Sequence, residues 1–322
     1  MDASGYVVNW YAYEPLKAPA VAATALFALT CIAHTWQMIR HKAWIWFVMV
    51  VAVAMEVFGY GIRIASTNDT SKKPPFVAQY VLIVLSPVLM TGIIYVAFGR
   101  IVFHVIPAAH RSTKLLWVSP RWVTPIFVGF DIAALMLQLV GAVMIAGTSI
   151  TDSNYLEKVH RGKYIALSGV SVQLLAFGLF SVIAVRFHII AKRFKESVQK
   201  RLTRIPGDEK YVTVEGIEGR KLRPNWELLL YAINISCALI MVRTIYREIA
   251  FAEGRSGYTN THEWVQYVFD TIPMFVLTVI YCFIPPGRYV QMSFKQTKGQ
   301  NAVPVSNDSE VEAHALQERA SG

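Results

Sequence analysis

Seven long runs of apolar residues divide the chain, and they restrict its possible folds more than any other feature. A helix needs roughly 20 apolar residues to cross about 30 Å of hydrocarbon, and each run has about that length or more. The sequence therefore predicts an all-α integral membrane bundle of seven transmembrane helices. The expected spans are residues 18–39, 44–65, 76–99, 121–147, 163–187, 226–250 and 264–284.

The composition excludes an ordinary soluble domain. Of the 322 residues, 54% are hydrophobic and only 16% are charged, whereas about 25% of the residues in a soluble domain are charged. The net charge of +10 could attract nucleic acid in a soluble protein. Here most basic residues lie beside the spans, so lipid headgroups are the expected counter-charge. The three cysteines, Cys31, Cys237 and Cys282, fall inside apolar runs and predict no disulfide framework.

The basic residues also predict an orientation. Of the 31 Lys and Arg residues, 21 follow the first, third, fifth and seventh runs, 7 lie on the opposite side, and three lie inside spans. Cytoplasmic loops carry the excess of Lys and Arg. Residues 1–17 are therefore expected outside, 18–285 as the seven-helix domain, and 286–322 as a disordered cytoplasmic tail. Asn68 begins a possible glycosylation sequon in the second loop, which this orientation places outside.

The segment from Arg186 to Ile205 is expected to continue the fifth helix into the cytoplasm. Its apolar residues recur at helical spacing among Lys and Arg. This pattern is typical of a basic amphipathic helix at the inner leaflet. A solvated helical extension is the alternative.

The second run carries charges within its apolar sequence. Glu56, Tyr60 and Arg63 are separated by four and then three residues, so a helix places them on one face. A charged residue at the bilayer centre costs about 2.5–3.5 kcal/mol on insertion scales, and such residues usually face a bundle interior or a wet cavity. A functional site is one interpretation of this face. The other is a structural ion pair that locks two helices together.

Polar side chains recur in the later runs as well. Any one of them is more often a packing feature than a site, because amides and small residues also join helices. Together they predict a formally neutral polar cavity inside the bundle, with three acids and three arginines. The predicted cavity residues are Glu56, Tyr60, Arg63, Tyr95, Asp131, Gln138, Gln173, Arg243, Arg247 and Asp270.

Three other intramembrane residues carry weaker signals. Pro87 and Pro273 each remove a helix hydrogen bond and are expected to disturb their helices beside the cavity. His34 is expected to be a packed, neutral histidine, because no metal-ligating residues flank it at ligand spacing. The chain contains no P-loop, HExxH, GxSxG or CxxC motif. We therefore expect no enzyme, no cofactor and no metal site.

Several short motifs resemble one known family in order along the chain. The second run contains Glu56-x-x-Gly59-Tyr60-x-x-Arg63, and the other matches are Tyr11 to Pro15, Pro87 with Tyr95 and Arg100, Asp131 with Gln138 and Gly141, Gly169 with Gln173, Arg243 to Arg247 with Gly254, and Glu263, Tyr267, Asp270 and Pro286-Gly287. This set is similar to the fungal lipid-translocating exporter family, the resistance-to-aminocholesterol type of seven-helix membrane proteins. One departure is Ala250, where the family usually has an acidic residue; here Glu248 and Glu253 lie nearby.

The resemblance implies a fungal protein of the plasma membrane that exports or flips lipid-like molecules. Our first hypothesis is therefore a translocator for an amphiphile, whose partners are membrane lipids and the amphiphilic substrate. Its intramembrane acids would receive a cationic head or carry protons, or its arginines would hold an anionic group. The alternative is a seven-helix receptor or sensor in which the same cavity binds a lipid-like ligand. A lipid-modifying enzyme is the least favoured class, because the chain has no nucleophile motif or metal cluster.

Overall fold

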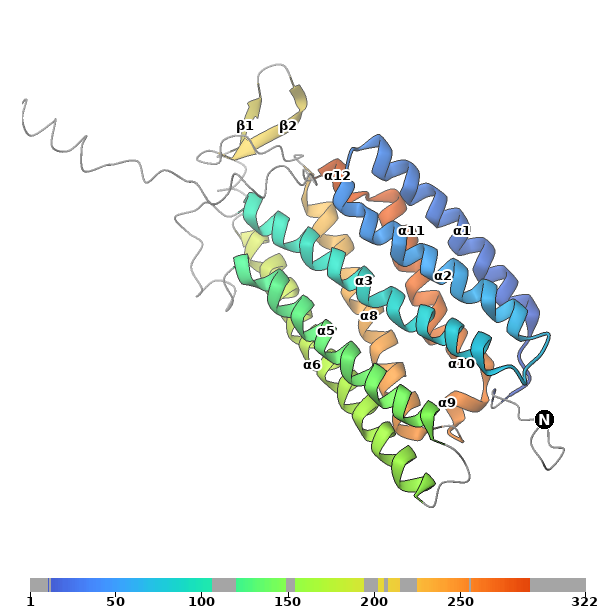
Figure 1. The fold of residues 1–322 in the computed structure, drawn as a ribbon. Coiled ribbons are helices and arrows are strands. Elements are labelled where there is room, and N and C mark those ends of the chain that lie inside the picture. Colours follow the sequence, from blue (N-terminus) through green and yellow to red (C-terminus); the bar gives the residue numbers. More distant parts are fainter. Residues whose placement is uncertain are drawn as a thin grey trace, which may run out of the picture. The chain divides into compact units, whose positions relative to one another are not determined.

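A computed structural model describes residues 11, 13–105, 120–148, 154–193, 202–205, 208–214, 225–254 and 256–289 of the chain (Figure 1). Within these residues, seven helices are long and apolar enough to cross a membrane. This confirms the predicted fold class, an all-α bundle of seven spans. Of the predicted disordered tail, residues 286–289 form a short helix, and residues 290–322 lie outside the described residues, as does the sequence between the fifth helix and residue 202.

The spans run through the predicted ranges, and two helices are longer than expected. The third and fifth extend beyond the apolar runs at both ends, because polar residues continue a helix once it leaves the hydrocarbon. The seven spans are α1 (Lys17–Arg40), α2 (Phe47–Ser66, preceded by the 3-10 turn η1, Trp44–Trp46), α3 (Lys73–Val105), α5 (Pro120–Gly147), α6 (Tyr155–Arg193), α8 (Glu227–Glu253), and a seventh built from α10 (Glu263–Gln266), η3 (Tyr267–Thr271) and α11 (Ile272–Phe283). Short helices α9 (Tyr258–Thr261) and α12 (Pro286–Tyr289) flank the seventh span.

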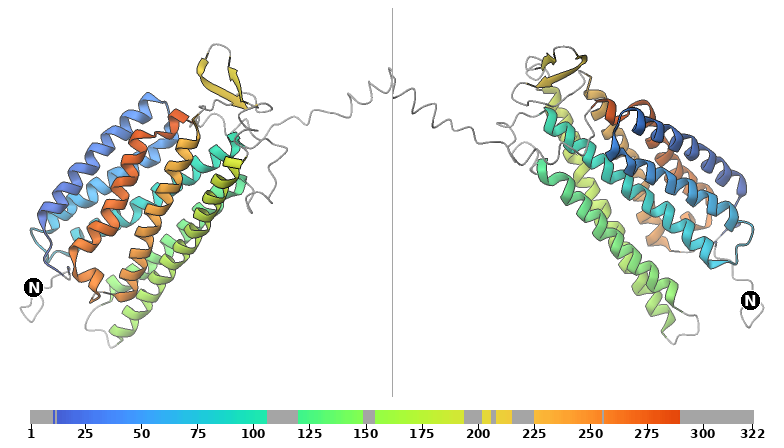
Figure 2. Two further views of the ribbon diagram at one scale, coloured as in Figure 1. Left: turned by 180° about the vertical axis from the view of Figure 1, so that it is seen from behind. Right: turned by 45° about the horizontal axis from the view of Figure 1, so that its top comes forward.

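The helices form a closed ring in the order α1, α2, α3, α5, α6, α8 and α11, with α11 packed back on α1. The helices α3 and α8 also contact each other across the ring (Figure 2). Successive spans alternate in direction, so one end of the bundle gathers the starts of α1, α3, α6 and α10 with the ends of α2, α5 and α8. We call this end the N-terminal end, because residues 13–16 lead into it.

The seventh span is irregular beside Pro273, where the sequence predicts a disturbed helix. Proline has no N–H to donate to the carbonyl four residues earlier. The chain forms a π-helical turn, η3, just before Pro273 in the first turn of α11. This turn contains Asp270. By contrast, α3 is α-helical on both sides of Pro87.

A two-stranded hairpin in the connection after α6 corrects the prediction of a helix that reaches Ile205. The strand β1 (Leu202–Ile205) pairs antiparallel with β2 (Asp208–Val214), and Leu202 lies opposite Val214. The described part of α6 ends at Arg193. Pro206-Gly207 and the β-branched and aromatic residues after them explain the difference, because Pro-Gly favours a turn and such residues favour strands.

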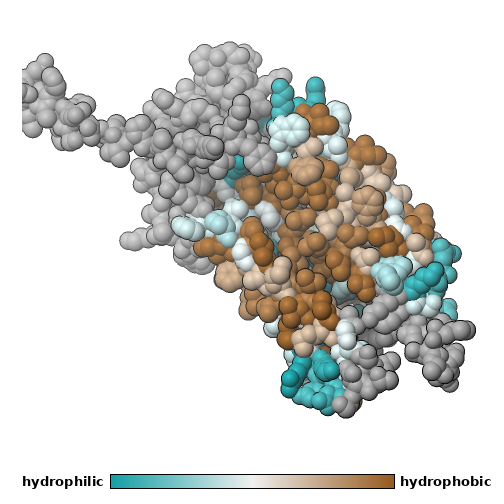
Figure 3. Space-filling view, viewed as in Figure 1, coloured by the Kyte–Doolittle hydropathy of each residue, from teal (hydrophilic) through white to brown (hydrophobic). Residues whose placement is uncertain are grey.

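The outer surface of the bundle is strongly apolar, as a membrane-spanning protein requires. Leu29, Ile32 and Phe283 expose 65%, 68% and 77% of their surface. In Figure 3 such residues form a broad brown region, with hydrophilic residues gathered toward the ends of the helices. A soluble protein rarely exposes an apolar patch larger than a few hundred Å². The protein is therefore an integral multi-pass membrane protein.

The helices α5 and α6 approach each other through small residues. A Cβ atom added to Gly141 would lie 2.5 Å from the Gly162 carbonyl oxygen, and one added to Gly169 would lie 2.6 Å from the Ala134 carbonyl oxygen. Only glycine allows backbones this close. The pair therefore forms a tight hairpin that packs against α3 through α5 and against α8 through α6.

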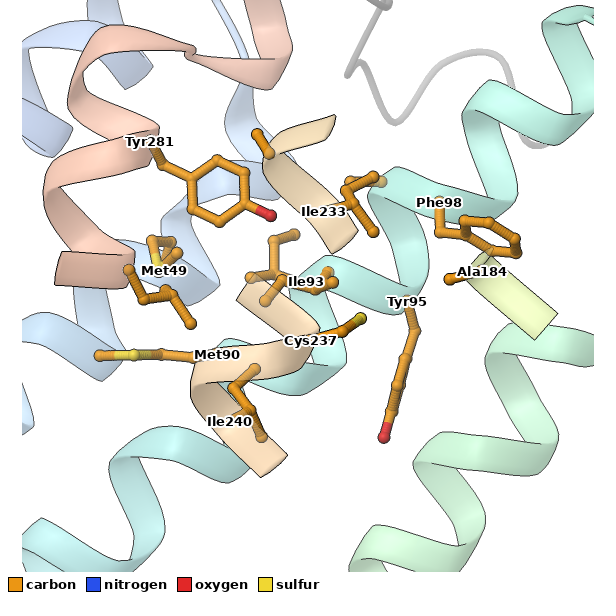
Figure 4. Close-up of a cluster of buried hydrophobic side chains, with 14 of the residues drawn as sticks. Met49, Met90, Ile93, Tyr95, Phe98, Ala184, Ile233, Cys237, Ile240 and Tyr281 are labelled. Atoms are coloured by element: carbon orange, nitrogen blue, oxygen red, sulfur yellow. The ribbon is translucent and has the colours of Figure 1, made fainter. Parts of the chain in front are cut away.

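The interior is divided along the membrane normal. In the half away from the N-terminal end, large apolar side chains of α2, α3, α8 and α11 fill the centre of the ring (Figure 4). Among them, Met90, Phe98, Ile233 and Tyr281 are at most 1% exposed. The buried charged side chains of α2 and α8 lie nearer the N-terminal end, because they come later along α8 than this core and later along α2 than Met49. Asp131 of α5 is different, because it contacts Thr91 at the level of the apolar core.

Candidate functional site

Asp270 lies between two arginines of α8 and is the centre of the buried charge network. Arg243 and Arg247 are one helical turn apart and face the π-helical turn η3. The Nε of Arg243 contacts one oxygen of Asp270, and Nη2 of Arg247 donates to the other at 2.5 Å. The three side chains expose only 7%, 13% and 1% of their surface. Two guanidinium groups therefore share one buried carboxylate.

Glu56 adds a second acid to this region from α2. It is 2% exposed and lies against Ser86 of α3, and Arg243 is its strongest charged neighbour. Glu56 makes no salt bridge with a described residue, because Arg243 and Arg247 both form their salt bridges with Asp270. Asp270 can balance only one of the two arginines, and Glu56 is a second acid in their neighbourhood.

Tyr60 connects this network to the seventh span. It lies one turn after Glu56 on the same face of α2, as the sequence predicts. Its hydroxyl shares a hydrogen bond of 2.5 Å with Thr271, next to Asp270. The ring stacks between Phe27 and Tyr267. Glu56 and Tyr60 thus face the interior, where the sequence places them.

Arg63 belongs to a second cluster, at the N-terminal end. Its Nη2 lies 2.7 Å from Oε1 of Glu263 and donates to the Tyr13 hydroxyl at 2.6 Å. The other Glu263 oxygen accepts the backbone N–H of Leu16 at 2.8 Å. Arg63 therefore pairs with Glu263 and not with Glu56, and the pair joins the second span to the seventh, as the structural interpretation of this face proposed.

The N-terminal segment covers this second cluster with aromatic rings. The Arg63 guanidinium lies within 6 Å of the ring centroids of Tyr11, Tyr13 and Tyr267. Tyr11 also donates to Ser66 at 3.0 Å. Burial raises the pKa of the Tyr13 hydroxyl, and the neighbouring Arg63 opposes that shift. Tyr11 and residues 13–16 thus cover Arg63 at the N-terminal end of the bundle.

Asp131 is separate from both clusters. It is 2% exposed on α5, and Thr91 of α3 donates to its Oδ2 at 3.0 Å. Tyr95 lies beside the carboxylate. Within the described residues, however, neither the Tyr95 hydroxyl nor Asp131 Oδ1 has a hydrogen-bond partner. No described basic side chain pairs with Asp131, so this buried acid stands alone between α3 and α5.

A pocket opens among α3, α5, α6 and α8 in the polar half of the bundle. The empty space between its lining atoms is about 320 Å³, a figure that includes open solvent, and the room inside for a water-sized molecule is about 20 Å³. At its wall, Nε2 of Gln138 donates to Oε1 of Gln173 at 3.0 Å and joins α5 to α6. The lining residues are Val84, Gln138, Val170, Gln173, Arg243, Thr244, Arg247 and Phe251.

The structure therefore divides the predicted cavity residues into groups. Four of the ten line the pocket: Gln138, Gln173, Arg243 and Arg247. Asp270, Glu56 and Tyr60 lie behind the arginines, whereas Arg63 belongs to the N-terminal cluster, and Asp131 and Tyr95 form a separate contact. The structure thus does not gather all ten residues around this one pocket.

Glu263 is the main residue that sequence reasoning did not assign to the site. Its signal was present, because Glu263, Tyr267 and Asp270 repeat the spacing of four and three residues found in Glu56, Tyr60 and Arg63. Both sets lie on one face of their spans. Glu263 stands at the very start of an apolar run, so the sequence does not indicate that it is buried. In the structure it is only 9% exposed.

Two further residues lie where the sequence predicts. The indole N–H of Trp46 donates to Nδ1 of His34 at 3.3 Å, so Nε2, 3.1 Å from the Thr278 carbonyl oxygen, carries the proton. The histidine is therefore packed and neutral. Asn68 is exposed just after α2, at the N-terminal end of the bundle.

Comparison with known proteins finds relatives along most of the chain. Residues 49–293 match the RTA1 like protein family. Protein RTM1 of Saccharomyces cerevisiae is 26% identical over 87% of this chain and 92% of its own length. The probable lipid transporter atnI of Emericella nidulans is 28% identical, over 87% of this chain and 68% of its own. The sphingoid long-chain base transporter RSB1 of Saccharomyces cerevisiae is 24% identical, over 81% and 69%. No solved structure matches.

Proposed function

Because the chain belongs to the RTA1-like family, we propose that it is a membrane translocator that exports or flips a lipid-like amphiphile. Two of the relatives above are named as transporters, one of lipid and one of a sphingoid long-chain base, and none of the three is named as an enzyme. At 24–28% identity these names support the class of activity and not a particular substrate.

The pocket is the observation that carries this proposal. It combines two guanidinium groups and two amides with the apolar side chains of Val84, Val170 and Phe251. All of these residues belong to membrane-spanning helices. A polar head needs hydrogen-bond partners inside the membrane, since an unsatisfied polar group costs several kcal/mol there. The pocket offers such partners to a head while apolar walls receive the adjoining chain.

Apolar side chains fill the half of the bundle away from the N-terminal end, so a ligand would reach the pocket from the other half. The core around Met90, Phe98 and Ile233 leaves no described polar path toward the opposite end. The bias of Lys and Arg supports an exoplasmic N-terminal end. The family resemblance, and not this bias, is the ground for proposing the plasma membrane as the protein's location. In this orientation the observed conformation is closed toward the cytoplasm, with the pocket on the exoplasmic half.

Each buried cluster receives a different role. Arg243, Arg247, Gln138 and Gln173 would contact the substrate head. Asp270, with Glu56 and Tyr60 behind it, would hold the arginines in position. The pair of Arg63 and Glu263, under Tyr13, would close the N-terminal end of the bundle. Asp131 and Tyr95 would adjust the contact between α3 and the α5–α6 hairpin.

The experiment is reconstitution of the purified full-length chain into phosphatidylcholine vesicles that contain a fluorescent short-chain lipid. Dithionite destroys the fluorophore in the outer leaflet, so movement of the inner pool appears as additional loss of fluorescence. Separate vesicles carry probes with an anionic, a zwitterionic or an amine head, with and without an imposed pH gradient. We expect the chain to accelerate movement of at least one probe. The matched control is the same protein after heat denaturation.

The same experiment separates the translocator from the receptor alternative. A receptor would bind an amphiphile and change conformation, but no probe would cross the membrane faster than in protein-free vesicles. A folded, monodisperse chain that moves none of the probes in either gradient direction contradicts the proposal.

A further inference from the structure

The lining of the pocket contains no acidic side chain. Its polar members are two arginines, two glutamines and Thr244, and the rest are apolar. The acids of this region lie elsewhere: Asp270 and Glu56 are behind the arginines, and Glu248 faces α6, where Ser171 donates to it at 2.6 Å. A ligand in the pocket therefore meets cationic and neutral donors first.

The arginines retain donor capacity beyond their structural contacts. Arg243 uses Nε for Asp270 and Nη2 for the Ile83 carbonyl oxygen at 3.0 Å. Arg247 uses Nη2 for Asp270, and its guanidinium lies 5.6 Å from the centroid of the Tyr80 ring. Its buried Nε has no hydrogen-bond partner among the described residues. Both arginines line the pocket, and a planar guanidinium suits the oxygens of a carboxylate or phosphate.

We propose that this pocket binds an amphiphile with an anionic head, a carboxylate or a phosphate ester, through Arg243 and Arg247. This inference rests on the proposed function and specifies its substrate class. The amides of Gln138 and Gln173 supply further hydrogen bonds, and Val84, Val170 and Phe251 contact the start of the apolar chain. An ammonium head would face two guanidinium groups with no carboxylate on the wall between them, and like charges at close range repel.

The first test is binding to the purified full-length chain in a nonionic detergent. The probes are dodecyl phosphate, dodecyltrimethylammonium and inorganic phosphate, and the readouts are the apparent Tm and the Kd from titration. We expect dodecyl phosphate to raise the Tm in a saturable manner and the other two to leave it unchanged. Equal stabilisation by the ammonium probe overturns the anionic head. Equal stabilisation by inorganic phosphate overturns the amphiphile and leaves a site for a free anion.

The second test adds a negative charge to the wall without disturbing the arginines. Gln173→Glu keeps an oxygen that accepts the Gln138 N–H, and Asp270 still holds both arginines. Loss of charge complementarity should weaken dodecyl phosphate binding roughly ten-fold or more. The matched control is Asn154→Asp, the same amide-to-acid change at an exposed position at the start of α6. Unchanged affinity in Gln173→Glu, or an equal loss in Asn154→Asp, contradicts the inference.

The binding test and the vesicle test can fail independently, so their results distinguish the anionic pocket from the translocator. Dodecyl phosphate that binds through the arginines while no lipid probe crosses the vesicles would support the anionic pocket and contradict the translocator. Movement of amine-headed probes alone, without binding of dodecyl phosphate, would support the translocator and contradict the anionic head.

Discussion

Asp270→Asn should be among the most damaging single substitutions in the bundle. The change keeps the shape of the side chain but leaves Arg243 and Arg247, which expose 7% and 13% of their side chains, without the carboxylate they share. Removing one partner of a buried ion pair costs about 3–5 kcal/mol. In a domain of this size each kcal/mol lowers the Tm by about 2–4 °C, so we expect a decrease of about 10 °C.

The assay is the apparent Tm of the detergent-purified chain, measured by fluorescence-detected size exclusion after heating. The matched control is Asp69→Asn, which makes the same change in the exposed pair with Lys72, whose side chains are 42% and 67% exposed. Exposed pairs contribute little, so this Tm should not change. Arg247→Met removes a charge but leaves Arg243 paired with Asp270, and its effect should be smaller. Because the pair is coupled, Asp270→Asn with Arg247→Met should cost less than the sum of the two. Equal shifts in Asp270→Asn and Asp69→Asn would refute the reasoning.

Three further predictions follow from single contacts. Glu56→Gln should lower efflux of an amphiphile from intact cells without lowering the protein level, because the side chain keeps its shape and loses only its ability to bind and release a proton; native efflux would refute the role of Glu56. Gly169→Ala should lower the stability of the α5–α6 hairpin by about 1–3 kcal/mol by overpacking, since its Cβ would lie 2.6 Å from the Ala134 carbonyl oxygen; Gly92→Ala, with nothing within 4 Å, is the control. For protein expressed in fungal cells, enzymatic deglycosylation should shift the gel band of the native protein and leave that of Asn68→Gln unchanged. If the native band does not shift, the prediction that Asn68 lies outside the cell loses support.

The seven spans could be predicted because hydrocarbon imposes a length on each apolar run. The helix limits differ mainly in α3 and α6, where polar turns extend the helix beyond the membrane. The hairpin at Leu202–Val214 was not predicted, because a helical stripe of apolar residues was followed past the point where Thr, Val and Pro-Gly favour strands and a turn.

The sequence predicts which polar residues share a helix face, but not which residues of other helices they contact. Helical spacing places Arg243 with Arg247 and Glu56 with Tyr60, because these pairs lie within one helix. It does not decide that Arg63 reaches Glu263 instead of Glu56, because that choice depends on how the second and seventh spans are aligned along the membrane. The absence of an acid from the pocket wall likewise depends on the direction in which Asp270 approaches the arginines.

The most direct test of the account is to block the pocket after the protein has folded. Val84 lines the pocket on α3, so Val84→Cys, reconstituted in vesicles and then treated with a methanethiosulfonate reagent, carries new bulk inside the pocket. The native chain and Thr148→Cys, outside the lining at the same end of the bundle, receive the same treatment as controls. The account predicts that lipid movement stops only in modified Val84→Cys and that dodecyl phosphate slows the modification. Full movement by modified Val84→Cys would contradict it.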